Sequence, residues 1–248
     1  MTASNGHRLG VVDEAGRGTP AWAWRGWADQ APDLGLSGWR DVVVVAPHPD
    51  DEVLGVGGLI RRLVRDGVRV RVVAVTDGEG APAPRGWSPE RLATERVIEA
   101  VAACGALGVD PPHRLGLPDG RVGEHEAALT EALSRLLSPS THCLATWRSD
   151  GYPDHEATGR AAAAACAQTS AALVEYPVWM WHWAAPDDPA VPWERVHRVA
   201  LTPQEREAKA VAVARHGTQL DPPAPGVDPV LPPFVVERLV TSYEMVMR

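Results

Sequence analysis

Hydrophobic positions begin to repeat regularly near residue 41, with a spacing that alternates between that of a strand and that of a helix. Residues 42–46 are a continuous run of Val and Ala, which is typical of a strand buried on both faces of a parallel sheet. Residues 53–65 carry apolar side chains at near-helical spacing, and residues 68–76 form a second apolar run. This order predicts a right-handed βαβ unit.

The same alternation continues to residue 215. We expect further strands at residues 113–117, 141–147, 172–183 and 195–201, and further helices at residues 89–104, 124–137, 154–168 and 203–215. Strands that alternate with helices along a chain predict an α/β fold, with a three-layer, open, mostly parallel sheet and helices on both of its faces.

The two ends of the chain lack this regular alternation of strands and helices. Residues 1–40 are rich in Gly, Trp, Asp and Pro, and we interpret them as an N-terminal extension with one short helix at 22–30. Residues 41–248 are expected to form a single domain. Residues 217–234 contain six prolines and predict a surface loop that is long enough to be a wall or lid of a site.

Charge and composition then exclude several classes of protein. The 248 residues are 45% hydrophobic, enough for one sizeable core, and they carry a formal net charge of −8. An acidic chain without a basic block repels phosphate, so we expect no nucleic-acid partner.

The three cysteines include no CxxC pair, which argues against a disulfide framework and fits a reducing compartment. Without a signal-peptide core or a transmembrane segment, the expected location is cytoplasmic. The pattern does not predict an oligomeric state.

The turn after the first predicted strand concentrates ionisable groups in the string PHPDDE, residues 47–52. One interpretation is structural: the acids cap the next helix and complement its dipole. The other is a metal site, because His48 and Asp51 at positions i and i+3 can project to one side of a turn. His155 follows a later predicted strand and reaches the same edge of the sheet. Two histidines and one carboxylate with a fourth position open are typical ligands of catalytic Zn²⁺.

These residues carry a resemblance to a known family. The string at 47–52 resembles the first motif of the PIG-L (LmbE-like) zinc-dependent N-deacetylases, and YPDH at 152–155 is similar to their second motif, usually HPDH. Supporting stretches extend the resemblance from about residue 41 to at least residue 220, as in TDGEG at 76–80, LGLPDG at 115–120 and YPVWMWHW at 176–183. The resemblance implies a Rossmann-like sheet, and a single PIG-L/LmbE-like deacetylase domain over residues 41–248.

The family also implies roles for particular residues. His48, Asp51 and His155 would bind zinc, and Asp50 would be the general base for attack of a zinc-bound water on an N-acetyl group. Tyr152 stands where the family has a histidine that helps to stabilise the oxyanion. A phenol can donate a hydrogen bond at neutral pH, so we expect activity to be retained.

Other polar residues near the expected strand ends are assigned supporting roles. Asp154 is expected to hold an imidazole or the turn, and Arg91, Asp119 and His182 are candidates for contacts with the substrate. If residues 172–183 form a strand, the tryptophans at 179, 181 and 183 share one face, which suits either sugar stacking or helix packing.

The predicted function is therefore removal of an N-acetyl group from an amino sugar or a sugar-bearing metabolite, a small-molecule substrate. The alternative is a catalytically weakened metal- and carbohydrate-binding protein that lost activity through Tyr152. A nucleotide-binding Rossmann protein is not expected, since HPDDE replaces the GxGxxG that would follow the first strand.

Overall fold

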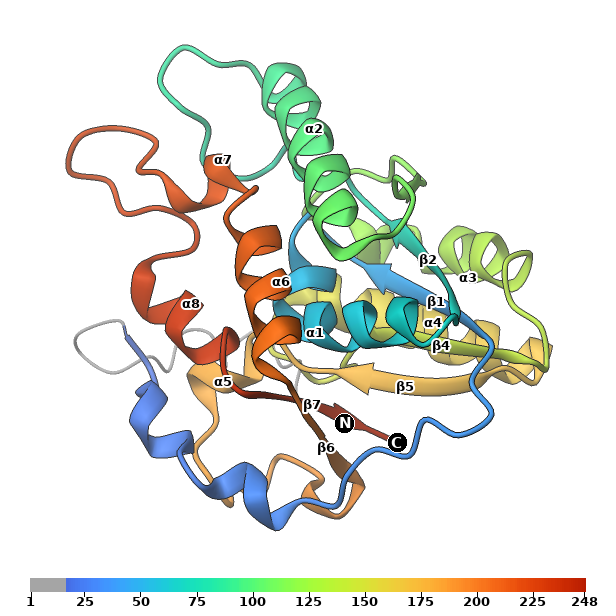
Figure 1. The fold of residues 1–248 in the computed structure, drawn as a ribbon. Helices are drawn as coiled ribbons and strands as arrows, with labels where there is room; N and C mark the ends of the chain where they lie inside the picture. The colour runs from blue at the N-terminus through green and yellow to red at the C-terminus, as the bar shows by residue number, and fades with distance from the viewer. Residues whose placement is uncertain (1–16) are drawn as a thin grey trace.

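Seven strands form one sheet in the order β3-β2-β1-β4-β5-β7-β6 in the computed structural model, which describes residues 17–248 (Figure 1). The strands β1 to β5 are parallel to their neighbours, whereas β7 pairs antiparallel with both β5 and β6. The predicted α/β class with a mostly parallel sheet is confirmed. The strands are β1 (Asp41–Ala46), β2 (Arg69–Ala74), β3 (His113–Arg114), β4 (Thr141–Thr146), β5 (Ala172–Tyr176), β6 (Val196–Ala200) and β7 (Tyr243–Met247).

Helices cover both faces of this sheet. They are α1 (Asp51–Arg65), α2 (Pro89–Leu107), α3 (Glu126–Ser134), α4 (Pro153–Thr169), α5 (Met180–Trp183), α6 (Pro203–Val213), α7 (Gly217–Leu220) and α8 (Pro233–Leu239). Short 3-10 helices lie at η2 (Ala21–Trp24), η3 (Trp27–Gln30), η4 (Val122–Glu124) and η5 (Trp193–Arg195). No helix in residues 17–248 is both long enough and apolar enough to cross a bilayer.

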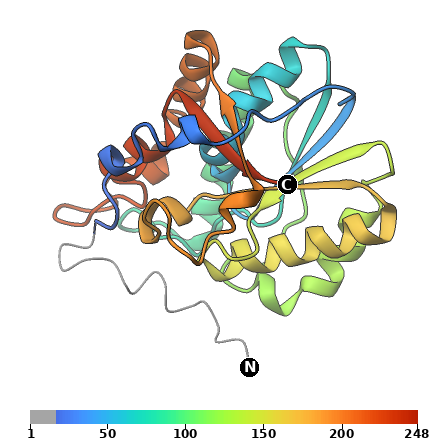
Figure 2. The same cartoon turned by 90° about the horizontal axis from the view of Figure 1, so that it is seen from below.

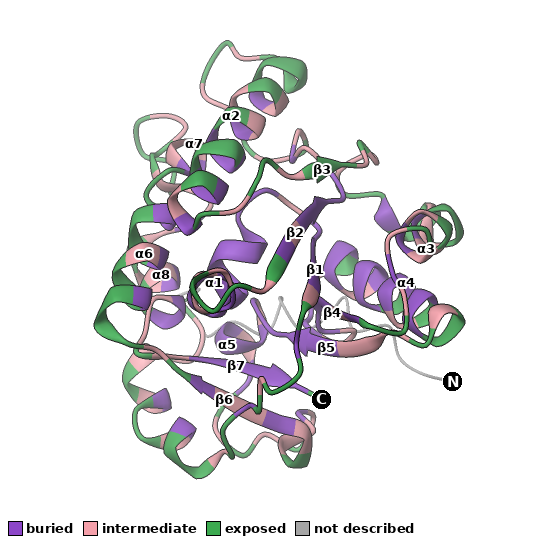
Figure 3. Cartoon of the chain, turned by 45° about the vertical axis from the view of Figure 1, so that its right-hand side comes forward, coloured by how far each residue is buried: buried purple, intermediate pink, exposed green. Residues whose placement is uncertain are grey.

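Strand β1 shows how the sequence makes the two cores. Its side chains alternate, so that Val42 and Val44 pack with α1 on one face, while Val43 and Val45 pack with α3 and α4 on the other. All four valines are fully buried. The burial map shows the same layering, with buried strands at the centre and exposed positions on the outer sides of the helices (Figure 3).

The expected strand at 172–183 is too long. Strand β5 ends at Tyr176, and Met180–Trp183 is the short helix α5. Pro177 ends the strand because proline has no N–H to donate to the sheet. The tryptophans that follow therefore do not share a face. Trp181 is buried against Trp24, Trp183 stacks on Trp147, and Trp179 lines a cavity.

The C-terminal part contains more structure than the sequence predicted. The proline-rich stretch at 217–234 includes the one-turn helix α7 and the beginning of α8, instead of being loop throughout. The strand β7 was not predicted at all. It enters the sheet between β5 and β6, and its Glu244 contacts the helix that begins the candidate site.

The described part of the N-terminal stretch packs against the C-terminal elements (Figure 2). The expected helix at 22–30 is two 3-10 helices, η2 and η3, separated by Gly26 in a left-handed conformation. Trp24 and Trp39 are buried in the core, and the backbone N–H of Leu34 donates to the carbonyl of Arg198 in β6. Residues 1–16 of the predicted extension lie outside the described residues.

Candidate metal centre and active site

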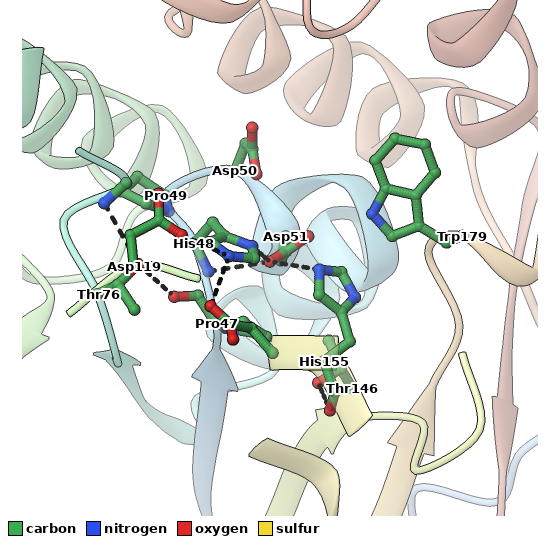
Figure 4. Close-up of polar contacts among 12 residues, drawn as sticks. Pro47, His48, Pro49, Asp50, Asp51, Thr76, Asp119, Thr146, His155 and Trp179 are labelled. Carbon is green, nitrogen blue, oxygen red and sulfur yellow. Dashed lines mark hydrogen bonds and ion pairs between the residues drawn. The ribbon is translucent and has the colours of Figure 1, made fainter. Parts of the chain in front are cut away.

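The candidate site lies at the carboxyl ends of the parallel strands, where the sequence placed it. The turn after β1 supplies His48, Asp50 and Asp51, and the start of α4 supplies His155 (Figure 4). His48, Asp50 and Asp51 border a cavity of about 370 Å³, whose other walls come from the segments after β2, β3, β4 and β5 and from residues 219–235. A cavity at this edge of the sheet is the usual binding site in an open α/β fold.

The carboxylate of Asp51 lies between the imidazoles of the two histidines. Its Oδ2 atom lies 3.2 Å from Nδ1 of His48 and 3.2 Å from Nε2 of His155. Burial alone would raise the pKa of Asp51, but the facing imidazoles hold it well below its usual range. Asp51 is therefore an ionised carboxylate between two imidazole nitrogens.

Each histidine turns its second nitrogen to another carboxylate. Nδ1 of His155 lies 2.8 Å from Asp150 Oδ2. Nε2 of His48 lies 3.1 Å from Asp119 Oδ1 and 3.4 Å from Asp154 Oδ2. Carboxylates in this position fix the orientation and tautomer of metal-binding histidines.

The three residues fit a divalent metal ion. Each of His48, Asp51 and His155 offers a ligand atom within 4.8 Å of the others. Nε2 of His155 is buried and, among the described residues, has no hydrogen-bond partner of suitable geometry. Nitrogen and carboxylate ligands in this number suit Zn²⁺ and leave a position for a substrate or water. A second group, His48 with Asp119 and Asp154, shares one histidine with the first.

Asp50 is buried beside this centre and has an unusual backbone. Its φ of 136° lies in a region that residues other than glycine rarely adopt, a strain that is typical of functional turns. Burial and the neighbouring Asp51 raise the pKa of Asp50 to about 7, although Arg96 opposes the shift. A carboxyl group with a pKa near neutrality is suited to exchanging protons.

Arg96 is a functional candidate that the sequence did not reveal. Its guanidinium is buried, donates to the carbonyls of Gly78 (2.8 Å) and Pro49 (3.0 Å), and lies 3.5 Å from Asp50 Oδ2. Gly78 has φ of 74°, and a Cβ there would lie 2.1 Å from Arg96 Nη1, so only glycine fits. Arg96 thus holds the Asp50 turn through backbone atoms that are remote in sequence.

Aromatic side chains form the opposite wall of the cavity. The Tyr152 ring stacks on Trp179 at 5.9 Å between centroids and meets the His48 ring edge-on at 5.4 Å. Burial raises the pKa of Tyr152, so its hydroxyl keeps its proton at neutral pH. His182 also lines the cavity, and burial together with Arg238 lowers its pKa to about 3.

Of the three remaining predicted residues, one lines the cavity and two do not. Asp119 lines the cavity, and Asp154 lies behind it, where it accepts hydrogen bonds from the backbone N–H groups of Gly120 and Val122. Arg91 does not line the cavity, and its guanidinium lies 4.3 Å from the Trp87 ring.

The fold and this centre define an α/β protein with a two-histidine, one-carboxylate site at the ends of its parallel strands. A sequence profile of the PIG-L family, described as GlcNAc-PI de-N-acetylase, matches residues 43–166, half of the chain. The chain belongs to the PIG-L family.

Relatives in this family are named as deacetylases of amino sugars. A 1D-myo-inositol 2-acetamido-2-deoxy-alpha-D-glucopyranoside deacetylase of Mycobacterium sp. (strain KMS) is 29% identical, over 75% of this chain and 76% of its own. One with the same activity in its name, from Saccharopolyspora erythraea, is 30% identical, over 72% and 77%. Among solved structures, the N,N'-diacetylchitobiose deacetylase of Pyrococcus horikoshii shares the fold, with a TM-score of 0.60, 23% identity and coverage of 75% and 73%.

Proposed function

We propose that this protein is a zinc-dependent N-deacetylase that hydrolyses the acetamide of an amino sugar or a sugar-bearing metabolite. The observation that carries the proposal is the convergence of two imidazole nitrogens on Asp51, with Asp50 beside them at the edge of a cavity. The named activities of the relatives support the same chemistry.

His48, Asp51 and His155 would hold the metal. Zinc bound there would supply a Lewis acid that polarises the acetamide carbonyl and makes a water molecule more acidic. With a cation bound beside it, Asp50 would have a lower pKa and its carboxylate would be ionised at neutral pH. His48 and His155 are kept in place by Asp119, Asp154 and Asp150.

Asp50 moves the proton in the reaction. Its carboxylate accepts a proton from the water that adds to the acyl carbon, and then gives it to the sugar nitrogen as the C–N bond breaks. The products are acetate and a free amine. Tyr152 lies against the His48 ring and is the proposed donor to the oxygen on which negative charge develops. Asp119 and His182 line the cavity and are the proposed contacts with the sugar.

Acetate release tests this proposal. The chelated protein is assayed on a panel of N-acetylated amino sugars with and without added zinc, beside Asp50→Asn. Asparagine keeps the size of aspartate, but its amide cannot accept the proton. We expect zinc-dependent release by the parent protein and a turnover roughly 10²–10⁴-fold lower for the variant.

Two results would contradict the proposal in different ways. Equal turnover by Asp50→Asn would remove Asp50 from the proton transfer. Retained binding of zinc and sugar without acetate release would favour the alternative, a metal- and carbohydrate-binding protein in which Tyr152 replaces the family's histidine.

A further inference from the structure

We propose that Asp150 is a positioning residue that sets the tautomer of His155 and, with the same carboxylate, fixes the cavity wall next to it. The inference rests on the proposed metal site, because it concerns how this chain prepares His155 to bind an ion. Asp150 lies two residues before the YPDH string at 152–155.

The carboxylate of Asp150 is fully buried and accepts from several donors. Its Oδ2 atom lies 2.8 Å from His155 Nδ1. Its Oδ1 atom accepts from the backbone N–H groups of Val178 and Met180, each at 3.0 Å, and Oδ2 also accepts from that of Trp179 at 2.9 Å. An ionised carboxylate can only accept, so it keeps the proton of the neutral imidazole on Nδ1 rather than on Nε2. The lone pair of Nε2 then faces Asp51, which is the form of histidine that binds a metal.

The same contacts hold the segment after β5. Three consecutive N–H groups, from Val178 to Met180, point to one side chain, and Trp179 in their middle lines the cavity and stacks on Tyr152. The Asp150 backbone is fixed as well, since its carbonyl accepts from Trp183 Nε1 at 2.7 Å. One buried carboxylate therefore links a metal ligand to an aromatic wall from another element.

The substitution Asp150→Asn tests whether Asp150 positions the His155 ring or only packs beside it. The amide oxygen can still accept from Val178 and Met180, but the NH₂ group then faces Nδ1 of His155 and the N–H of Trp179, which are both donors. The neutral ring relieves this by moving its proton to Nε2, where it blocks the ligand position. We expect the zinc Kd of the folded variant to rise about 10- to 100-fold, measured by competition with a chelating dye.

Glu175→Gln is the matched control. Glu175 is also fully buried and accepts from the backbone and side chain of Arg148, but it contacts neither proposed histidine ligand. Its amide variant is expected to lose stability and keep the parent zinc Kd. Because a positioning residue acts through its partner, Asp150→Asn is expected to change the zinc Kd no further in a His155→Ala background.

The outcomes are distinguishable. Equal zinc affinity in the parent and Asp150→Asn overturns the inference, as does an equal loss in Glu175→Gln. A parent protein that binds no zinc overturns the proposed metal site itself. Circular dichroism of the metal-free proteins verifies folding, and Asp150→Ser, whose hydroxyl is smaller, replaces the amide variant if that does not fold. The same 10- to 100-fold weakening is expected of it.

Discussion

Asp50 and Asp51 are neighbours in sequence but have opposite electrostatic environments. Asp51 faces two imidazoles, and its pKa is held well below the usual range in spite of burial. Asp50 is buried beside that negative charge, and its pKa is raised to about 7. Pairs of acids whose surroundings push their pKa values apart commonly divide ligand and proton-transfer roles. These opposite environments support the proposed division of roles, with Asp51 as the metal ligand and Asp50 as the proton carrier.

Tyr152 gives the sharpest prediction at the scale of one residue. If its hydroxyl donates to the developing oxyanion, Tyr152→Phe lowers kcat by about 10- to 10³-fold with little change in KM, since the bond matters only once charge has formed. Steady-state kinetics of acetate release give both constants. Tyr152→His is the matched variant, because an imidazole can donate from a similar position, and part of the kcat is expected to return.

Full activity of Tyr152→Phe would contradict this role. The donor would then have to lie elsewhere, and His182 is the first candidate, because it lines the same cavity. A Tyr152→His protein as inactive as Tyr152→Phe would also argue against an interchangeable donor.

The sequence predicted the central residues of the site and the supporting Asp154, but it missed Arg96 and the role of Asp150. His48, Asp51 and His155 were found because carboxyl ends of parallel strands meet at one edge of the sheet. The role of Arg96 could not be predicted, since its main partners are carbonyl oxygens, which no residue type reveals. Asp150 was missed for a similar reason, because three of its donors are backbone N–H groups of a segment expected to be a strand.

Among the elements, α1 shows why the missing strand matters to the site. The helix is interrupted at Val56, and the N–H groups of Gly58 and Leu59, just after the break, donate to the carboxylate of Glu244 in β7. Buried Lys209 lies 2.7 Å from the same carboxylate. Because the helix is interrupted at Val56, the first turn of α1, which carries Asp51, need not follow the axis of the rest of the helix. Strand β7 was not predicted from the sequence because it is only five residues long and carries the charged Glu244 at a buried position.

The junction of α1 and α6 gives a prediction about pH. Glu205 accepts from Arg62 Nε at 3.0 Å and from the Thr202 N–H at 2.9 Å. Burial raises the pKa of Glu205, but these donors outweigh it and lower the pKa to about 2. A depressed folded-state pKa means that the stabilisation is complete above the unfolded value, about 4.3, and is lost as the pH falls towards 2. We expect Glu205→Gln to lower the free energy of unfolding by about 1–3 kcal/mol at pH 7.

Urea unfolding between pH 7 and pH 3 measures this difference, which is expected to shrink on acidification. Glu124→Gln is the control, since Glu124 forms an exposed pair with Arg121, and such exposed pairs contribute little to stability. A constant difference between Glu205→Gln and the parent protein across this pH range would show that the charge of Glu205 does not stabilise the junction.

At the scale of the whole molecule, the proposed ligands join two central elements of the fold. His48 and Asp51 follow β1, His155 lies in the helix after β4, and these two strands pair at the centre of the sheet. An ion bound only by the folded protein stabilises it by mass action, by about 2.7 kcal/mol at a hundredfold excess over its Kd. For a chain of this size, each kcal/mol added to the free energy of unfolding raises the Tm by about 2–4 °C.

Chelation is therefore expected to lower the Tm of the purified protein by about 5–10 °C, and added zinc to restore it. Differential scanning calorimetry measures the shift. Magnesium is expected to restore little, because it prefers oxygen ligands and two of the three proposed ligands are imidazoles. His155→Ala is expected to respond much less to either treatment, since it keeps only two ligands. An equal response in that variant would mean that the stabilising ion binds elsewhere in the molecule.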